Sequence, residues 1–260
     1  MMKLTNAQWE LLEPYFPREH GKNPQGGRPG YSNRALLQGV LWVMRTGARW
    51  NDLEMPKGYP SGSTCYRHFR KWVELGIFDK IIRALVEDLR KRGKIDLTET
   101  FIDATFVEAK KGARKFGKTK SGKGSKIMAI VDRRSLPIAL LVESASPHES
   151  TLALPTLRSR YTRHVPDRII GDKAYDSDPL RRDLKKRHRC QLIAPHKSNR
   201  KKPPTQDGRA LRRYRRRWVV ERFFAWIQSF RRVETRYERY PQNYFAFVEL
   251  ASICILLRRF

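Results

Sequence analysis

Apolar residues recur at intervals of three and four through the first third of the chain, a spacing that predicts amphipathic helices. The clearest run covers residues 33–46 and stops at Gly47, a residue that commonly follows the last turn of a helix. Three further helices are predicted: residues 4–15 with Thr5 as N-cap, a segment that begins near Ser63 and Thr64, and residues 78–92. This part of the chain therefore reads as all-helical.

After Lys94 the period changes to two, which predicts β-strands. Residues 100–107 alternate, so that Asp103 shares one face with Phe101, Thr105 and Val107. Further strands are predicted at 126–131, 138–142, 168–171 and 191–194, and helices at 152–161, 179–187, 209–232 and 244–257. This is the element order of a ribonuclease-H-like α/β domain, a mixed five-stranded sheet with flanking helices. We expect it in residues 98–260, preceded by a small all-helical domain in residues 1–97.

The charge balance points to a polyanionic partner. The chain has 55 Lys and Arg against 26 Asp and Glu, a net charge of +29, and such a surface repels itself and attracts nucleic acid. A hydrophobic content of 40% argues against a disordered polycation. Two basic runs stand out: residues 110–126, predicted as a flexible loop, and residues 196–217. The second run supplies candidate phosphate contacts at Lys197, Arg200, Lys201 and Lys202.

The helix that begins near Thr64 alternates aromatic and basic residues. Its aromatic side chains could seat it on neighbouring helices while the basic edge faces a DNA groove. The alternative is an ordinary amphipathic helix whose basic residues face water. The candidate DNA contacts on this helix are Arg67, His68, Arg70 and Lys71.

Several other classes of protein find no support. The three cysteines are scattered and the histidines lack zinc-type spacing, which excludes a disulfide framework and a standard zinc finger. No Walker-type glycine loop is present, so no nucleotide cofactor is expected. The longest apolar stretch, residues 245–257, contains Glu249 and is too short to span a bilayer, and no signal-peptide core opens the chain. We expect a cytoplasmic, nucleoid-associated protein without a membrane partner.

Three carboxylates are the candidate catalytic residues. Asp103 lies within an apolar strand, where an unpaired charge is costly, and Asp172 follows a strand end, where open α/β sheets bind ligands. Asp178 is expected to cap the next helix, which leaves Asp172 available for function. Glu221 lies on a polar stripe of the predicted helix 209–232. Taken singly, Asp103 could be the ion-pair partner of an arginine, Asp172 a turn residue, and Glu221 part of a solvated helix face. Together, they could hold Mg²⁺ for phosphoryl transfer.

The segments around these acids resemble the three acidic blocks of DDE transposases, specifically the bacterial insertion-sequence transposases of the IS four/five group. The blocks are residues 101–105, 171–176 and 217–222. The hallmark around the third acid is Tyr, Arg, Glu and Lys at fixed spacing; Tyr214, Arg217 and Glu221 match it, whereas Gln228 stands where the group has Lys. The segments 4–9, 27–29, 45–50 and 63–67 resemble the N-terminal helical domain of the same proteins, so the resemblance covers essentially the whole chain.

This resemblance implies a transposase that binds terminal inverted repeats and cleaves and rejoins DNA. Asp103, Asp172 and Glu221 would hold two Mg²⁺ or Mn²⁺ ions, and the partners would be double-stranded transposon ends and target DNA, bound by a homodimer or larger assembly. Lys173, Tyr214, Arg217 and Gln228 become further candidate DNA contacts. Two alternatives remain open: a non-catalytic DNA-binding protein derived from such an element, and a recombinase with Tyr175 or Tyr214 as nucleophile.

Overall fold

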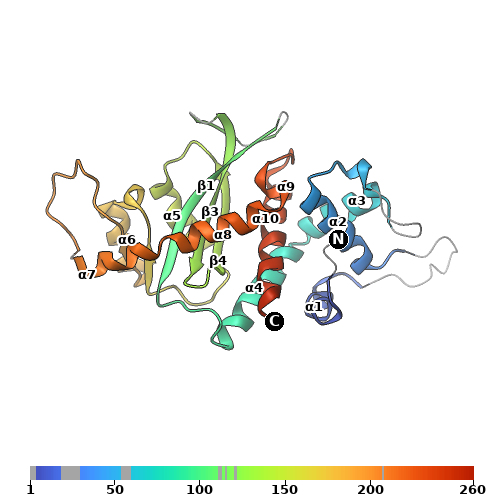
Figure 1. Ribbon diagram of the computed structural model, residues 1–260, viewed down its shortest axis with the longest axis horizontal. Helices are drawn as coiled ribbons and strands as arrows, with labels where there is room; N and C mark the ends of the chain where they lie inside the picture. Colours follow the sequence, from blue (N-terminus) through green and yellow to red (C-terminus); the bar gives the residue numbers. More distant parts are fainter. Residues whose placement is uncertain are drawn as a thin grey trace.

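The structure, a computed structural model, describes residues 4–18, 30–53, 60–110, 113–114, 116–119, 122–206 and 208–260. Helices α1 to α3 occupy one end of the molecule, α4 and α10 lie side by side in its middle, and a mixed sheet with its flanking helices forms the other end (Figure 1). The predicted fold class, a helical region followed by a mixed α/β domain, is confirmed. The predicted division at residue 97 stays a prediction.

The four predicted N-terminal helices are present as α1 (Asn6–Leu12), α2 (Asn33–Thr46), α3 (Gly62–Glu74) and α4 (Ile77–Lys91). Short 3₁₀ turns follow α1 (η1, Glu13–Tyr15) and precede α3 (η2, Trp50–Asp52). Thr5 caps α1 as expected, because its hydroxyl accepts the Gln8 N–H at 3.1 Å while the Gln8 side chain accepts the Thr5 N–H. Gly47 ends α2 with a φ of 73°, a left-handed conformation that favours glycine.

The five predicted strands form the body of the sheet. They are β1 (Thr100–Glu108), β3 (Gly122–Asp132), β4 (Pro137–Ser144), β5 (Arg168–Ile170) and β6 (Gln191–Ile193). Strand β3 runs antiparallel to both β1 and β4, whereas β1, β5 and β6 are parallel neighbours. The prediction of a flexible loop over residues 110–126 is wrong for part of that run, since β2 (Gly117–Thr119) pairs with the start of β3. Residues 111, 112, 115, 120 and 121 lie outside the described part.

Two sets of helices cover the two faces of the sheet. Thr105 lies on the same face of β1 as Asp103 and contacts Gln228 of α8 (Trp218–Gln228). Lys126 pairs with Phe106 in the register, so it faces the other side, where it contacts Glu149 of α5 (Glu149–Arg158). Helix α6 (Asp178–His188) packs beside β6. The face that carries Asp103 is therefore the one that α8 crosses (Figure 1).

The single helix predicted over residues 209–232 is wrong, because the chain breaks it into four pieces. These are α7 (Gly208–Leu211), the 3₁₀ segment η4 (Arg212–Arg216), α8 and α9 (Arg231–Glu234). Arg213 and Arg216 both pair with the buried Glu99, at 2.6 and 2.7 Å. A spacing of three residues places them on the same side of a 3₁₀ turn, so one buried carboxylate favours that conformation.

Helix α10 (Pro241–Leu256) joins the two ends of the molecule. Thirteen of its sixteen residues are buried, and it packs against α3 and α4 on one side and β4 on another. Despite this apolar character, no helix in the described part of the chain has the length and hydropathy needed to cross a bilayer. The long apolar stretch of the sequence thus belongs to the protein core.

Glu249 is a carboxylate within that core, 5% exposed on α10. Burial, together with the charge of Asp79 on α4, raises the pKa of Glu249 to about 8. Because the folded-state pKa lies above the unfolded value, the stability linked to this group is fully present below about pH 4.5 and is lost as the pH rises through about 8. The core therefore tolerates Glu249 best in its protonated form.

We expect Glu249→Gln to raise the melting temperature at pH 8.5 by about 4 °C or more, and to raise it much less at pH 5. The neutral amide removes the cost of burying a charge, and each kcal/mol shifts the melting temperature of a chain of this size by roughly 2–4 °C. Differential scanning calorimetry at both pH values measures the change. Glu234→Gln, an exposed position on α9, is the matched control and should show no such pH-dependent gain. Equal shifts at the two pH values would contradict the assignment.

Candidate active site

Asp103 lies in the middle of the sheet, on the face that α8 crosses. Its Oδ1 accepts the Ala104 N–H at 2.9 Å, and its Oδ2 is 3.2 Å from the guanidinium of Arg217. The side chain is 14% exposed. Burial raises the pKa of Asp103 to about 6 against the opposing effects of Ala104 and Arg217, and the charges of Asp172 and Glu149 add to the rise. Strand β1 thus holds a carboxylate whose charge is poorly solvated by water.

Asp172 lies two residues beyond the end of β5, the strand that runs parallel to β1. The parallel register pairs Thr100 with Ile169 and Phe101 with Ile170, and the charge of Asp172 acts on Asp103, so the two carboxylates lie near each other. The Asp172 side chain accepts the Ala174 N–H at 2.8 Å and caps the 3₁₀ turn η3 (Lys173–Tyr175). This turn folds back over the strand end, where a Cβ at Gly171 would lie 2.6 Å from the Tyr175 ring. Glycine is required for that close approach.

The expected capping role of Asp178 is wrong. Ser177 is the N-cap of α6 and accepts the Leu180 N–H, whereas Asp178 is the first residue of the helix. Asp178 instead forms ion pairs with Arg181 at 2.8 Å and with Arg200 at 3.0 Å. Asp172 is itself the cap of η3, so it is not left uncommitted by a cap at Asp178.

Glu221 lies one turn into α8 and reaches the site through Arg217. One guanidinium nitrogen of Arg217 is 2.6 Å from Glu221 Oε1, and another is the one that contacts Asp103. The Glu221 side chain is 52% exposed and that of Arg217 is 30% exposed. The ring of Tyr214 lies under the same guanidinium, 5.8 Å from it. Two of the three predicted acids thus share a single positive group.

The chemistry of this set fits a hard divalent cation. All three groups are carboxylates, the ligands that Mg²⁺ and Mn²⁺ prefer, and in this structure the Arg217 guanidinium supplies the positive charge between Asp103 and Glu221. Among the residues that the structure describes, no three His, Cys, Asp or Glu side chains lie close enough together to form a metal centre. The assignment of Asp103, Asp172 and Glu221 as metal ligands therefore stays a prediction.

Gln228 occupies the position where the IS four/five hallmark has Lys. Its amide donates a hydrogen bond to Thr105 Oγ1 at 3.1 Å, two residues beyond Asp103 on β1. This contact ties the end of α8 to the strand that carries the first acid. Gln228 thus makes a structural contact at a position where a lysine would add a positive charge.

The predicted DNA contacts of the second basic run do not behave alike. Lys197, Lys201 and Lys202 are exposed, as is Lys173 on η3. Arg200 is only 12% exposed on its side chain and pairs with Asp176 and Asp178. Sequence reasoning placed Arg200 among the phosphate contacts and missed Asp176, whose only sequence signal is its place in the second acidic block. The exposed cations of this region on η4 are Arg212 and Arg215.

The candidates on α3 lie beyond α10 from the sheet and are not brought to the acids (Figure 1). Arg67 and Lys71 are exposed, whereas Arg70 pairs with Glu74 at 3.0 Å and lies over the Tyr240 ring. His68 packs against Trp72, and its pKa is lowered by burial and by the charges of Arg67 and Lys71. Cys65, Phe69 and Trp72 form the buried face of the helix, as the aromatic spacing predicted.

Two sequence families match the chain along most of its length. Residues 95–257 match the family described as "Transposase DDE domain", and residues 4–82 match the one described as "Putative transposase of IS4/5 family". The chain belongs to the DDE transposase family. The resemblance read from the three acidic blocks is thereby confirmed, and family membership places the protein among enzymes that cleave and transfer DNA strands. Domains of this family generally use divalent metal ions.

Individual relatives of this DDE transposase are also insertion-sequence proteins. An "Insertion element IS402 uncharacterized 16.2 kDa protein" of Burkholderia cepacia is 39% identical over 119 residues, which cover 45% of this chain and 80% of that protein. A "Putative transposase for insertion sequence element IS402" of the same organism is 30% identical over 159 residues, 55% of this chain and 71% of the relative. The crystal structure of the Mos1 strand transfer complex covers 86% of this chain and 83% of its own at 12% identity, with a TM-score of 0.28, a likeness that supports nothing further.

Proposed function

We propose that this protein is a metal-dependent transposase that binds the terminal inverted repeats of an insertion sequence and cleaves and rejoins DNA there. The observation that supports the proposal most directly is that, within a matched DDE domain, Asp103 on β1 and Asp172 just beyond the end of the neighbouring β5 lie near enough for the charge of Asp172 to raise the pKa of Asp103. The strongly basic surface supports a polyanionic substrate. The proposal also places the protein at the bacterial nucleoid, as a homodimer or larger assembly on DNA. Light scattering of the protein–DNA complex would test the size of that assembly.

Each residue of the site has a proposed role. Asp103, Asp172 and Glu221 would bind the cations, which supply Lewis-acid stabilisation of charge on the phosphate oxygens when bound. Arg217 neutralises Asp103 and Glu221 in the present arrangement, and its contact to both acids keeps α8 aligned with β1. Gln228 fixes the far end of the same helix. The exposed lysines Lys173, Lys197, Lys201 and Lys202 would bind the phosphates on either side of the scissile bond.

The test is cleavage of DNA that carries the inverted repeats flanking the gene. We expect the purified protein to nick DNA at the element's ends in the presence of Mg²⁺ or Mn²⁺. Cleavage should stop when a chelator is added and resume when the cation is restored. Scrambled ends of equal length are the control. Tight, end-specific binding without cleavage under any of these conditions would favour the non-catalytic alternative.

The tyrosine-recombinase alternative makes a different product. It requires a covalent bond between a tyrosine and a DNA phosphate, which denaturing electrophoresis of the reaction detects. Tyr175 is fully buried, and burial raises its pKa, so its phenol is a poor nucleophile in this structure. Tyr214 is half-buried beneath Arg217. A protein–DNA adduct at either residue would overturn the metal-dependent proposal.

A further inference from the structure

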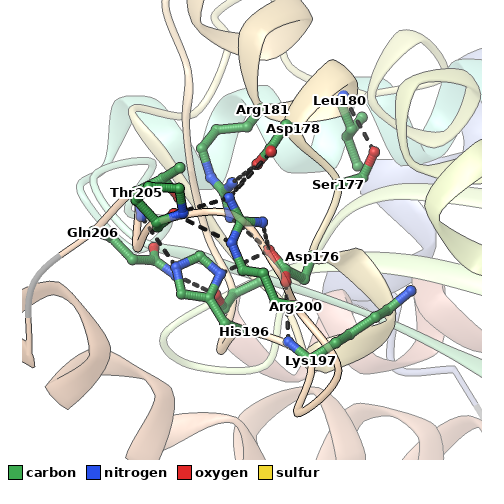
Figure 2. A network of polar contacts seen from close by, with 12 residues as sticks. Asp176, Ser177, Asp178, Leu180, Arg181, His196, Lys197, Arg200, Thr205 and Gln206 are labelled. Carbon is green, nitrogen blue, oxygen red and sulfur yellow. Dashed lines mark hydrogen bonds and ion pairs between the residues drawn. The ribbon is translucent and has the colours of Figure 1, made fainter.

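A single buried carboxylate, Asp176, holds the loop that follows β6. Its side chain is 2% exposed, and its Oδ1 lies 2.9 Å from His196 Nδ1, 3.2 Å from Arg181 and 3.3 Å from Arg200 (Figure 2). Its Oδ2 accepts the backbone N–H of Lys197 at 3.0 Å. Three of these four donors belong to residues 196–200, so the loop is attached to Asp176 at several points.

The same contacts close the loop on itself. His196 donates from Nδ1 to Asp176 while its Nε2 accepts the Thr205 N–H at 3.2 Å, which fixes the neutral tautomer of the ring. Arg200 contacts both Asp176 and Asp178 and also donates to the Pro203 carbonyl. Gln206 donates to the Ala194 carbonyl. Residues 194–206 thus form a closed loop, although the segment has no helix or strand of its own.

Asp176 is ionised to support this arrangement. Burial alone would raise its pKa, but the Lys197 N–H, His196 and Arg181 outweigh burial and lower the pKa of Asp176 to about 2. A buried carboxylate with four donors is costly to form, and most of those donors serve the loop rather than the sheet. The network therefore mainly holds the loop in place.

The loop lies next to the candidate active site. Asp176 follows Asp172 by four residues, and the intervening turn η3 is anchored by the buried Tyr175. On the outer side of the loop, Lys197, Lys201 and Lys202 line a cavity of about 610 Å³ that also borders the first turns of α5 and α6. The lysines are exposed, and the two carboxylates among the residues that line this cavity, Asp176 and Asp178, form their ion pairs with Arg181 and Arg200.

We propose that Asp176 is a positioning residue that holds loop 194–206 so that Lys197, Lys201 and Lys202 form a preorganised phosphate-binding arm beside Asp172. The inference rests on the proposed DNA-processing function. A closed loop has lost its backbone freedom on folding, so DNA does not have to order it on binding. The long lysine side chains then start from fixed Cα positions, and each phosphate that they neutralise releases counterions.

The central test is the sign of the effect of Asp176→Asn on DNA binding. The variant removes a negative charge from a basic region, so a purely electrostatic role predicts tighter binding. A positioning role predicts the opposite, which is DNA binding about 10-fold weaker than wild type at 100 mM salt. It also predicts a smaller slope of log affinity against log salt concentration. That slope should approach the slope of the triple variant Lys197→Gln/Lys201→Gln/Lys202→Gln. That triple variant should lose up to about 2.7 of the slope, since each phosphate contact contributes roughly 0.9.

A matched control and a second variant complete the design. Asp183→Asn on α6 makes the same charge change at an exposed ion pair with Arg187 and should not weaken binding. His196→Ala breaks the contacts to Asp176 and Thr205 without changing a formal charge, and it serves where Asp176→Asn fails to fold. Hydrogen exchange without DNA should become at least 10-fold faster in residues 195–206 of either variant, whereas the strands β1 and β5 keep their protection.

The outcomes separate this inference from the proposed function. Weaker binding with faster loop exchange, and a raised KM for DNA at a kcat within about threefold of wild type, support the positioning role. Faster loop exchange with unchanged or tighter DNA binding overturns it, and so does unchanged exchange. A wild-type protein that binds and cleaves DNA while Asp176→Asn behaves identically refutes the inference alone. A wild-type protein that binds no DNA overturns both.

Discussion

Glu221→Gln should reduce strand cleavage by more than about 100-fold while leaving DNA affinity within a few-fold of wild type. Glutamine keeps the size and hydrogen-bonding capacity of the side chain but lacks the charge that a hard divalent cation requires. The Arg217 guanidinium already pairs with Glu221 and Asp103, so this helix position faces the site that also contains Asp172. Single-turnover cleavage of labelled element ends measures the rate, and fluorescence anisotropy measures the affinity.

Glu234→Gln is the appropriate comparison for this experiment. Glu234 is exposed on α9, and we expect its variant to cleave at the wild-type rate. Glu238 is unsuitable, because it is 8% exposed and pairs with Arg232 at 3.1 Å, so a glutamine there would leave a buried arginine without its partner. An active Glu221→Gln, or a Glu234→Gln as defective as Glu221→Gln, would remove Glu221 from the site.

Arg67→Ala combined with Lys71→Ala should weaken binding to the element's ends by about 10- to 100-fold and reduce the preference for those ends over scrambled DNA. We propose that the helical residues 1–97 bind the ends through α3, where these two side chains are exposed on the edge opposite Cys65, Phe69 and Trp72. A side chain that reads a base edge contributes roughly 1–3 kcal/mol of discrimination. Competition binding with specific and scrambled duplexes gives both quantities.

Lys80→Ala with Lys91→Ala provides the matched charge change. Both lysines are exposed on α4, and the double variant removes the same two positive charges from the helical region. This double variant should weaken binding to specific and to scrambled DNA by the same small factor. If the two double variants lose affinity equally for both DNAs, α3 contributes charge alone and the end-binding role is wrong.

The position of Asp103 and Asp172 is the part of the site that follows from local sequence patterns. A period of two placed Asp103 within a strand, and an apolar segment ending in glycine placed Asp172 at a strand end. Both placements depend on neighbouring residues, so short-range patterns suffice to predict them. The parallel pairing of β1 with β5, which brings the segment that carries Asp172 next to the strand that carries Asp103, follows from the element order.

The contacts of the arginines could not be predicted in this way. Arg217 lies 114 residues from Asp103, and Arg200 lies 24 residues from Asp176, so no local spacing identifies either pair. Every arginine in a basic run carries the same pattern, and only the fold decides which of them meets a buried carboxylate. The broken helix has the same cause, since Glu99, which pairs with Arg213 and Arg216, lies more than 100 residues before them in the sequence.

Helix α10 has a consequence for synthesis of the protein. Helix α4 packs its apolar side against α10, yet roughly 150 residues separate the end of α4 from the start of α10. At about 5–20 residues per second, a ribosome needs roughly 8–30 s to translate that interval. During this time the nascent α4 presents Ile81, Leu85 and other core residues without their partner. The helical end of the molecule therefore completes its core only after α10 has been translated, and until then this apolar surface stays open to non-native contacts.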